Sequence, residues 1–378
     1  MRRRHQAFFL ALAAEAEPKL LGPEQVIWLE RLEREHDNLR AALEGSGDAE
    51  AVLRIAGTLW RFWQVRSYFK EGRERLTAAL AGASASTPPP IRAKALNGAG
   101  VLARSQGDYD TARAWVQESV DLYRQAGDKL GIATSLTNLG LITYAQGDYS
   151  AARTLHADSL AIRRELGDKR GIATSLNNLG LVTLEQGDHI AAQAMYFEAV
   201  GLYRDLGDKG GMASALNNEG NVAHNLGDFV TARTIYEASL ALRRELGDRQ
   251  GVAISLINLG SVAQKQGDFA AAHRMHAESL TLFRELGHRV GIAYALGAFG
   301  SLASIQQQYS RATRLWSAAH SLRELLDAPL SPSERTEYDQ ELAKTRTALG
   351  EKDFSLAWTE GSAFTLDHAI DYALEEIP

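Results

Sequence analysis

Apolar and small residues recur along the chain at helical spacing, and the pattern itself repeats every forty residues. One column consists of leucines: Leu96, Leu136, Leu176, Leu216, Leu256 and Leu296. A second column consists of alanines, each followed three positions later by a larger apolar residue: Ala112, Ala152, Ala192, Ala232, Ala272 and Ala312. Residues three or four apart share a helix face, and small residues let two helices approach closely. The pattern predicts repeated hairpins of two tightly packed helices and no useful strand.

Glycine marks the ends of these helices. It occurs every twenty residues from position 107 to position 287, and Asp follows it each time except at His288. Glycine reaches the left-handed conformation that ends a helix, and Asp accepts hydrogen bonds from the free N–H groups of the next one. A second glycine ladder has a period of forty: Gly100, Gly140, Gly180, Gly220, Gly260 and Gly300. Each twenty residues therefore predict one helix and one tight turn.

A helical hairpin with a small Gly in its first helix and a small Ala in its second resembles the tetratricopeptide repeat. The forty-residue period, with Leu-x-Asn-Leu-Gly and Gly-Asp-Tyr/Phe-x-x-Ala, is similar to the longer variant of kinesin light chain and Pins-type adaptor proteins. The resemblance implies an all-α, right-handed α-solenoid of six hairpins with helical caps. Departures are Leu in place of an early Trp, Glu219 in place of Leu, and Gln307-Gln308 in place of Gly-Asp.

The flanks predict a division into an N-terminal helical region (1–85), six repeats (86–327) and a C-terminal helical cap (328–378). The first residues favour a helix ending near Pro18 over a signal peptide, because acidic residues occupy the position of a cleavage site. Residues 28–43 predict one amphipathic helix. Residues 53–81 predict a degenerate hairpin with Gly57 and Gly72 in the two small positions.

Motifs in both flanks resemble the C-terminal helical region of large bacterial signal-transduction ATPases, many of which carry a LuxR-type DNA-binding domain. These motifs are Trp28-Leu-x-x-Leu-x-x-Glu, Trp60-Arg-Phe-Trp63 and Ala357-Trp358-x-x-Gly361. In that family the repeats are the sensor or partner-binding arm. This chain has neither a phosphate-binding loop nor a basic recognition helix, so it is a fragment of such a regulator or a free-standing relative.

Composition narrows the function. Of 378 residues, 45% are hydrophobic and 23% charged, which excludes a disordered chain. The net charge of −6 disfavours binding to nucleic acid or an anionic membrane. Cysteine is absent, which excludes disulfides, thiolate zinc sites and a cysteine nucleophile. No apolar run reaches the roughly 20 residues of a membrane span, and we expect a cytoplasmic protein.

The resemblance places the first helices on the concave face of the solenoid. Its inward positions lie two residues before the forty-residue glycine, one after it, and four and five after it. Applied to this sequence, and with the neighbouring amides added, these positions give fourteen candidate partner-binding residues. They are Arg104, Asn138, Tyr144, Asn177, Asn178, Leu184, Asn217, Asn218, Asn221, His224, Asn225, Asn258, Gln264 and Lys265. Asn offers both a donor and an acceptor, so an Asn ladder can bind the backbone of an extended peptide. Equally, these amides can bond between adjacent repeats, and the sequence leaves both roles open.

Other chemistry is weakly supported. Gly98-Ala-Gly100 fits a dinucleotide fingerprint but lacks the preceding strand that such a site needs. His156 and His276 share one repeat column, which favours packing over metal binding. Arg163-Arg-Glu-Leu166 and its counterpart at 243 suit a solvated helix end. No catalytic motif stands out, so we expect no enzyme, cofactor or metal.

The sequence thus predicts a non-catalytic scaffold that binds a protein or peptide segment, as the sensor or partner-binding arm of a bacterial regulatory system. The resemblance also allows a sister ATPase or DNA-binding domain as partner, without direct contact to nucleic acid or membrane. The alternative is a small-molecule inducer-sensing domain of a transcriptional regulator. Oligomeric state stays open.

Overall fold

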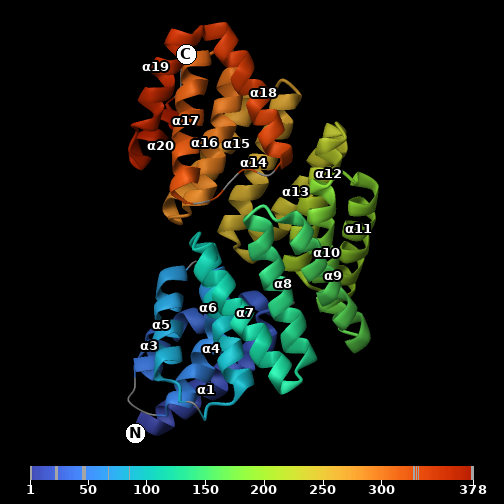
Figure 1. Cartoon of the computed structure of the whole chain (residues 1–378), viewed down its shortest axis with the longest axis vertical. Helices are drawn as coiled ribbons and strands as arrows, with labels where there is room; N and C mark the ends of the chain where they lie inside the picture. The colour runs from blue at the N-terminus through green and yellow to red at the C-terminus, as the bar shows by residue number, and fades with distance from the viewer. Residues whose placement is uncertain are drawn as a thin grey trace. The chain divides into compact units, whose positions relative to one another are not determined.

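The computed structural model describes residues 2–21, 24–44, 48–66, 68–84, 86–326, 328, 330 and 332–375. All regular secondary structure in these residues is helical, in twenty helices, which confirms the predicted all-α fold of helical hairpins (Figure 1). The chain forms two compact units, Met1–Ala215 and Leu216–Pro378, whose boundary falls within one helix. Each unit is described by itself below.

Unit 1 begins with irregular helices and continues into regular hairpins. Its helices are α1 (Arg2–Lys19), α2 (Gln25–Arg34), α3 (His36–Glu44), α4 (Ala49–Val65), α5 (Phe69–Gly82), α6 (Pro89–Ser105), α7 (Tyr109–Ala126), α8 (Lys129–Ala145), α9 (Tyr149–Leu166), α10 (Lys169–Glu185) and α11 (His189–Asp205). The next helix, α12 (Lys209–Asn225), contains the boundary between the units.

Unit 2 completes the repeats and adds three C-terminal helices. Its helices after α12 are α13 (Phe229–Leu246), α14 (Arg249–Lys265), α15 (Phe269–Glu285), α16 (Arg289–Ile305), α17 (Tyr309–Leu325), α18 (Pro332–Leu349), α19 (Glu351–Ser362) and α20 (Leu366–Leu374). None of the helices described is long and apolar enough to cross a lipid bilayer.

The turns form as the Gly-Asp pairs predict. Every glycine at twenty-residue spacing from Gly107 to Gly287 has a positive φ, between 61° and 84°. The Asp after each turn caps the next helix; Asp148 Oδ1, for example, accepts the Ala151 N–H at 3.0 Å. Where the pattern breaks, the geometry persists: His288 Nδ1 accepts the Gly291 N–H at 2.9 Å, and Gln307 adopts a φ of 61°. The turn is therefore fixed by its packing as well as by its preferred residues.

One stability prediction follows from these caps. Asp188 Oδ1 accepts the Ala191 N–H at 3.1 Å at the start of α11. Asp188→Ala should lower the free energy of unfolding by about 1 kcal/mol, because a helix-opening N–H loses its acceptor. Urea unfolding measures the loss, and Asp188→Asn should retain most of the stability. Equal losses in both variants would contradict the capping role.

A large side chain packs over each glycine of the forty-residue ladder. These side chains belong to the second helix of the same hairpin and are buried: Val116, His156, Tyr196, Tyr236, His276 and Trp316. A Cβ at Gly140 would lie 2.6 Å from the His156 ring, and one at Gly180 would lie 2.9 Å from the Tyr196 ring. Real Cβ atoms do not approach so closely, so glycine lets the two helices meet across a ring.

Two arginines expected in solvent are instead buried. Arg163 and Arg243 keep only 7% and 6% of their surface exposed, and each packs over the glycine near the start of the next helix, Gly171 or Gly251. Tyr123, Tyr203 and Phe283 take the same position in the other hairpins. Arg164, one residue further on, is exposed, so the prediction of a solvated face was wrong for the first arginine of each pair.

The N-terminal flank differs from two predictions. Residues 28–43 form two helices, because the chain breaks at Glu35 between α2 and α3. In the degenerate hairpin, α4 and α5 begin forty residues before α6 and α7, which places Trp60, and not Gly57, in register with Gly100. Gly72 does take the small position, since a Cβ there would lie 2.8 Å from Trp63.

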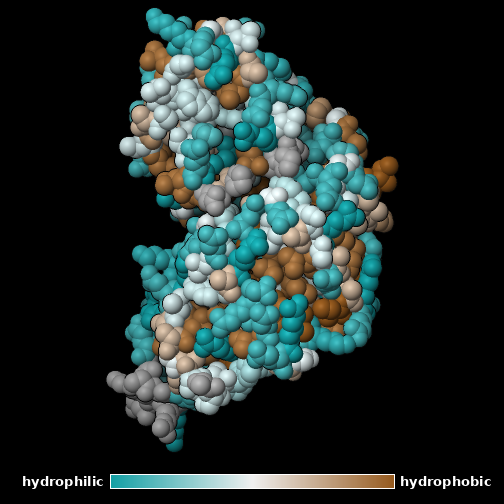
Figure 2. All heavy atoms as spheres, viewed as in Figure 1, coloured by the Kyte–Doolittle hydropathy of each residue, from teal (hydrophilic) through white to brown (hydrophobic). Residues whose placement is uncertain are grey.

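The C-terminal helices pack against the last hairpin. Tyr338, Leu342 and Trp358 pack against the buried cluster that contains Trp316, and Thr365 caps α20 by accepting the His368 N–H at 3.2 Å. These contacts agree with the expected helical cap. Hydrophilic side chains cover much of the face shown in Figure 2, with small patches of hydrophobic side chains between them. The three-part division of the chain stays a prediction.

Candidate functional site

One face of the first helices lines a pocket in each unit. The positions lie ten, six and three residues before the forty-residue glycine, and this 4–3 spacing places them on one helix face. They are Leu130, Thr134, Thr137, Arg170, Thr174 and Asn177 in unit 1, and Ile254, Ile257, Val290, Tyr294 and Gly297 in unit 2. The repeat therefore presents the same helix face to both pockets with different chemistry.

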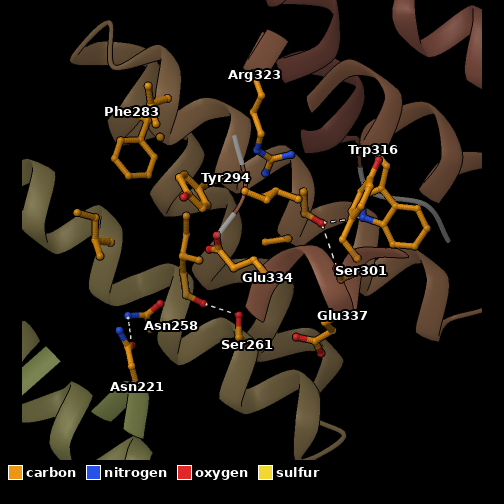
Figure 3. Close-up of a pocket in the computed structure, with 18 of the residues that line it drawn as sticks. Asn221, Asn258, Ser261, Phe283, Tyr294, Ser301, Trp316, Arg323, Glu334 and Glu337 are labelled. Atoms are coloured by element: carbon orange, nitrogen blue, oxygen red, sulfur yellow. Dashed lines mark hydrogen bonds between the residues drawn. The ribbon is translucent and has the colours of Figure 1, made fainter. Parts of the chain in front are cut away.

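The unit 2 pocket has a volume of about 450 Å³ and is lined by residues of α12 and of α14 to α18 (Figure 3). Its walls are mainly aromatic and aliphatic on α14, α15 and α16, with Ile254, Ile257, Phe283 and Tyr294. Amides and hydroxyls border these walls. A volume of this size suits a small ligand or a few residues of a peptide.

An amide cluster forms one side of the unit 2 pocket. Asn258 Nδ2 donates to Asn217 Oδ1 at 3.2 Å and to Asn221 Oδ1 at 3.4 Å, and the Tyr236 hydroxyl donates to Asn221 Oδ1 at 2.7 Å. No residue that the structure describes bonds to Asn221 Nδ2 or to Asn258 Oδ1. The cluster thus holds both side chains in place and leaves one donor and one acceptor group for a ligand.

Charged groups lie away from this amide cluster. Figure 3 shows Arg323, Tyr294 and Glu334 grouped on another side of the pocket. The Arg323 guanidinium stacks over the Tyr294 ring at 5.4 Å, and burial lowers the pKa of Arg323. Desolvation opposes ionisation of Glu337, but its 2.7 Å ion pair with Lys265 outweighs this and lowers the pKa of Glu337.

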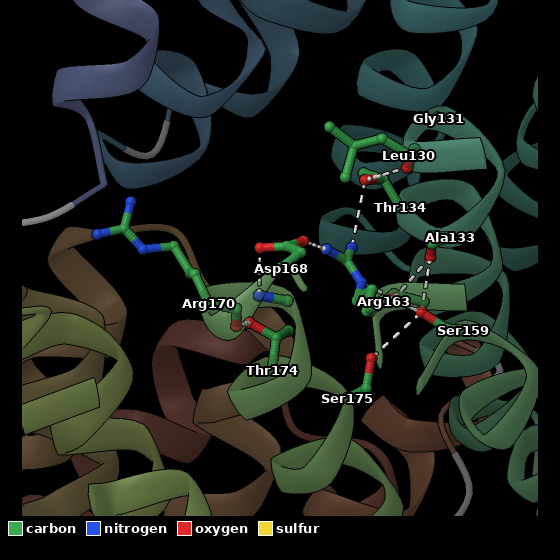
Figure 4. Close-up of polar contacts among 12 residues, drawn as sticks. Leu130, Gly131, Ala133, Thr134, Ser159, Arg163, Asp168, Arg170, Thr174 and Ser175 are labelled. Carbon is green, nitrogen blue, oxygen red and sulfur yellow. Dashed lines mark hydrogen bonds and ion pairs between the residues drawn. The ribbon is translucent and has the colours of Figure 1, made fainter. Parts of the chain in front are cut away.

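The unit 1 pocket is larger, about 750 Å³, and more of its lining residues are charged. Figure 4 shows one edge of it, where Arg163 bridges three helices. Its guanidinium pairs with Asp168 at 2.5 Å and donates to Thr134 Oγ1 at 3.2 Å, while Asp168 Oδ1 accepts the Gly171 N–H at 3.0 Å. Arg170 donates to the Leu21 carbonyl at 2.7 Å. Ionic contacts therefore connect successive hairpins along this pocket.

Amides and phenols complete the unit 1 pocket. Asn138 Nδ2 donates to Asn97 Oδ1 at 2.9 Å. The bond joins the first helices of adjacent hairpins, as the bond from Asn258 to Asn217 does in unit 2. Tyr203 bonds to Thr174 at 2.9 Å, and burial raises the pKa of Tyr203 to about 12. Part of the Asn ladder therefore bonds between adjacent first helices, as the structural alternative predicts.

The pockets bring together only some of the predicted partner-binding residues. Those lining a pocket are Asn138 and Asn177 in unit 1, and Asn217, Asn221 and Asn258 in unit 2. The others line neither pocket: Arg104, Tyr144, Asn178, Leu184, Asn218, His224, Asn225, Gln264 and Lys265. Whether any of the fourteen binds a partner stays a prediction.

Burial and local contacts explain most of the second group. Leu184 and Gln264 are buried, and Asn178 is 7% exposed with its Nδ2 unbonded within the described structure. Tyr144 donates to Glu185 at 3.2 Å. Lys265 was expected to meet a partner, but it pairs with Glu337 of α18. The C-terminal helices therefore occupy part of the face predicted for a partner in unit 2.

Sequence reasoning missed the residues six positions before the glycine, which include Lys94, Thr134, Thr174 and Tyr294. Their signal is present, because they share a helix face with Asn177 and Asn217 at the i, i+3 spacing. It also missed Arg61, which stands forty residues before Val101 and lines the unit 1 pocket. Extending the forty-residue register backwards would have found it.

The histidine column serves packing. His156 and His276 are fully buried against Gly140 and Gly260, and neither ring bonds to a described residue. Among the residues described, no group of three His, Asp or Glu side chains could hold a metal ion.

Comparisons with known proteins identify the fold. Three solved structures resemble the chain along most of its length. The first is a Rap protein complexed with competence and sporulation factor (TM-score 0.66, 12% identity, 97% of this chain and 98% of that one). The second is the Rap conjugation gene regulator of the plasmid pLS20 in complex with the Phr* peptide (TM-score 0.63, 14% identity, 86% of this chain and 96% of that one). The third is NprR in complex with its cognate peptide NprX (TM-score 0.54, 15% identity, 91% of this chain and 92% of that one).

At these identities the likeness establishes the fold alone. No curated protein sequence is significantly similar to the chain. The sequence model of the tetratricopeptide repeat matches residues 91–165, 131–205 and 211–285, which together span half of the chain. The forty-residue hairpins, their glycine and alanine columns and this match agree, and the chain belongs to the tetratricopeptide-repeat family.

Proposed function

We propose that the chain is a non-catalytic scaffold that binds an extended peptide or protein segment in the unit 2 pocket, as the sensor arm of a bacterial regulatory system. The observation that carries this proposal is the pair Asn221 and Asn258, fixed by their own hydrogen bonds beside an apolar wall. A sister ATPase or DNA-binding domain is a further partner that the resemblance supports.

The chemistry of the pocket suits a peptide backbone. Asn221 Nδ2 is a donor for a backbone carbonyl, and Asn258 Oδ1 is an acceptor for a backbone N–H. The bonds from Tyr236 and within the Asn cluster hold both amides in one orientation, which reduces the entropy lost on binding. Ile254, Ile257 and Tyr294 offer apolar contacts for the side chains that alternate along an extended segment.

The similar solved structures add support at a coarser level. Each of the three is described as a complex with a named peptide or factor, on a fold that covers at least 86% of this chain. Other proteins with this architecture are therefore described in complex with peptides, which supports the same role for this chain. The pocket residues, and not the likeness, determine which segment would bind.

Filling the pocket tests the proposal. Ala298 lines the pocket on α16, and Ala298→Trp places an indole in the space that a peptide would occupy. Peptides are first selected by the full-length chain from a phage-displayed library of random peptides. Fluorescence polarisation should then show binding to Ala298→Trp weaker by about tenfold or more, since the occupied volume is no longer free.

Ala238→Trp is the matched control, because Ala238 is exposed on α13 and lines neither pocket. It should bind the selected peptides as the parent chain does, and circular dichroism should show both variants to be folded. Failure to select any peptide, or equal binding by both variants, would overturn the proposal.

A further inference from the structure

The charges in the unit 1 pocket are almost completely paired. Three cations each contact a carboxylate: Lys94 with Glu17 at 2.6 Å, Arg163 with Asp168 at 2.5 Å, and Arg170 with Asp208 at 3.1 Å. The fourth carboxylate, Asp128, accepts the Gly131 N–H at 2.9 Å at the start of α8. Each carboxylate that lines the pocket is thereby committed to a partner.

Arg61 is the exception among the described residues of this pocket. Its guanidinium makes no hydrogen bond or ion pair to any of them and lies over the ring of Trp60, its neighbour on α4, at 4.7 Å. Burial lowers the pKa of Arg61, and the nearby Arg170 charge acts in the same direction, whereas Asp208 and Glu17 favour its charge. The side chain is thus a half-buried, unpaired cation that lines the pocket.

A half-buried guanidinium without an acceptor in the protein has donors available for a ligand. The Trp60 indole contacts the face of the guanidinium and leaves the N–H donors at its edge without an acceptor. A carboxylate or phosphate suits these donors, because two parallel N–H···O bonds match the planar fork of the guanidinium. Among the described cations of this pocket, Arg61 alone has no acceptor for these N–H donors.

The groups around Arg61 suit a small polar ligand. The same pocket contains the Asn97–Asn138 amide pair, the Tyr203–Thr174 hydroxyl pair and the Lys94 ammonium. Its 750 Å³ lies within the usual range for small-molecule sites. We propose that the unit 1 pocket binds a small ligand by a carboxylate or phosphate group held by Arg61. Neighbouring amides and hydroxyls bind the rest of the molecule.

This site is separate from the proposed peptide site. Its residues all belong to unit 1, and none of them lines the pocket that contains Asn221 and Asn258. Small anions test it, so its failure leaves the peptide proposal standing, and the reverse also holds.

Thermal unfolding of the full-length chain tests the assignment with two probes, sodium glutarate and sodium phosphate, against sodium chloride at equal ionic strength. An anion that binds only the folded state raises the midpoint in a saturable manner. We expect glutarate, phosphate or both to do so and chloride not to. A shift with glutarate alone assigns a carboxylate, and a shift with phosphate alone assigns a phosphate.

Variants localise the effect. Arg61→Gln should abolish the anion-dependent shift. Arg54→Gln, on the exposed side of the same helix, should keep it, because Arg54 pairs with Glu50 at 2.8 Å outside the pocket. Arg61→Lys keeps the charge without the planar fork and should weaken the apparent affinity by about tenfold. It also decides the matter if Arg61→Gln fails to fold.

Two results would overturn the assignment. One is a parent chain that neither anion stabilises beyond chloride. The other is an anion-dependent shift that survives in Arg61→Gln or keeps its full affinity in Arg61→Lys.

Discussion

Acidification from pH 7 to pH 5 should cost the folded chain about 4 kcal/mol through two residues, His156 and His276. Both rings are fully buried, and burial lowers the pKa of each to about 4 from an ordinary value of 6.5. For His276 the nearby His273 adds to the decrease. Between pH 6.5 and pH 4 both imidazoles are protonated in the unfolded chain and neutral in the folded chain. Stability therefore falls as the pH falls through that window and levels off below pH 4.

The variant His156→Phe/His276→Phe separates this effect from the titration of carboxylates. Tyr196 and Tyr236 show that six-membered rings fit the same column over Gly180 and Gly220. Each single variant should remove about 2 kcal/mol of the stability loss between pH 7 and pH 5, and the double variant about 4 kcal/mol. A smaller pH dependence should remain, because burial also lowers the pKa of His36, His224 and His288. Urea unfolding across this range measures the slopes. An unchanged slope in the double variant would contradict the assignment.

The fold was predictable because the chain repeats a local rule. A Gly-Asp turn and two small-residue columns recur at fixed spacing, so each hairpin confirms the next. The irregular flank offered no such repetition. There Trp60 replaces the ladder glycine, which hid the register of α4, and Glu35 ends a helix inside an unbroken amphipathic pattern. Periodicity detects a face but not a break within it.

The candidate sites were predictable only in part. The amides that line the pockets follow from their spacing, since Asn138 and Asn258 occupy equivalent positions. The partners of charged side chains do not follow from spacing. Arg163 is buried because Asp168, across a helix-ending turn, and Thr134, on another helix, meet its guanidinium. Lys265 is paired because α18 returns to the repeats. Such contacts depend on tertiary structure, which helical periodicity does not contain.

Gly361→Ala should lower the free energy of unfolding by about 3 kcal/mol, a large effect for one methyl group. Gly361 is buried on α19, and a Cβ there would lie 2.7 Å from the Cα of Arg314 on α17. Backbone cannot rotate aside as a long side chain can, so the two helices must separate. Separation weakens the bond from the Ser317 hydroxyl to the Trp358 carbonyl, now 2.6 Å, and the Arg314–Glu360 ion pair, also 2.6 Å.

The same substitution at Gly201 is the control for helix propensity. Gly201 lies within α11, and a Cβ there would meet no atom within 4 Å. Gly201→Ala should therefore raise stability by about 0.5–1 kcal/mol, because alanine loses less backbone entropy on folding. Urea unfolding measures the change in the free energy of unfolding for both variants, which should be a loss for Gly361→Ala and a gain for Gly201→Ala. Hydrogen exchange should show faster opening of α19 only in Gly361→Ala, since only that helix loses its close packing. If Gly361→Ala matched Gly201→Ala in stability, α19 would not pack on α17 by backbone contact.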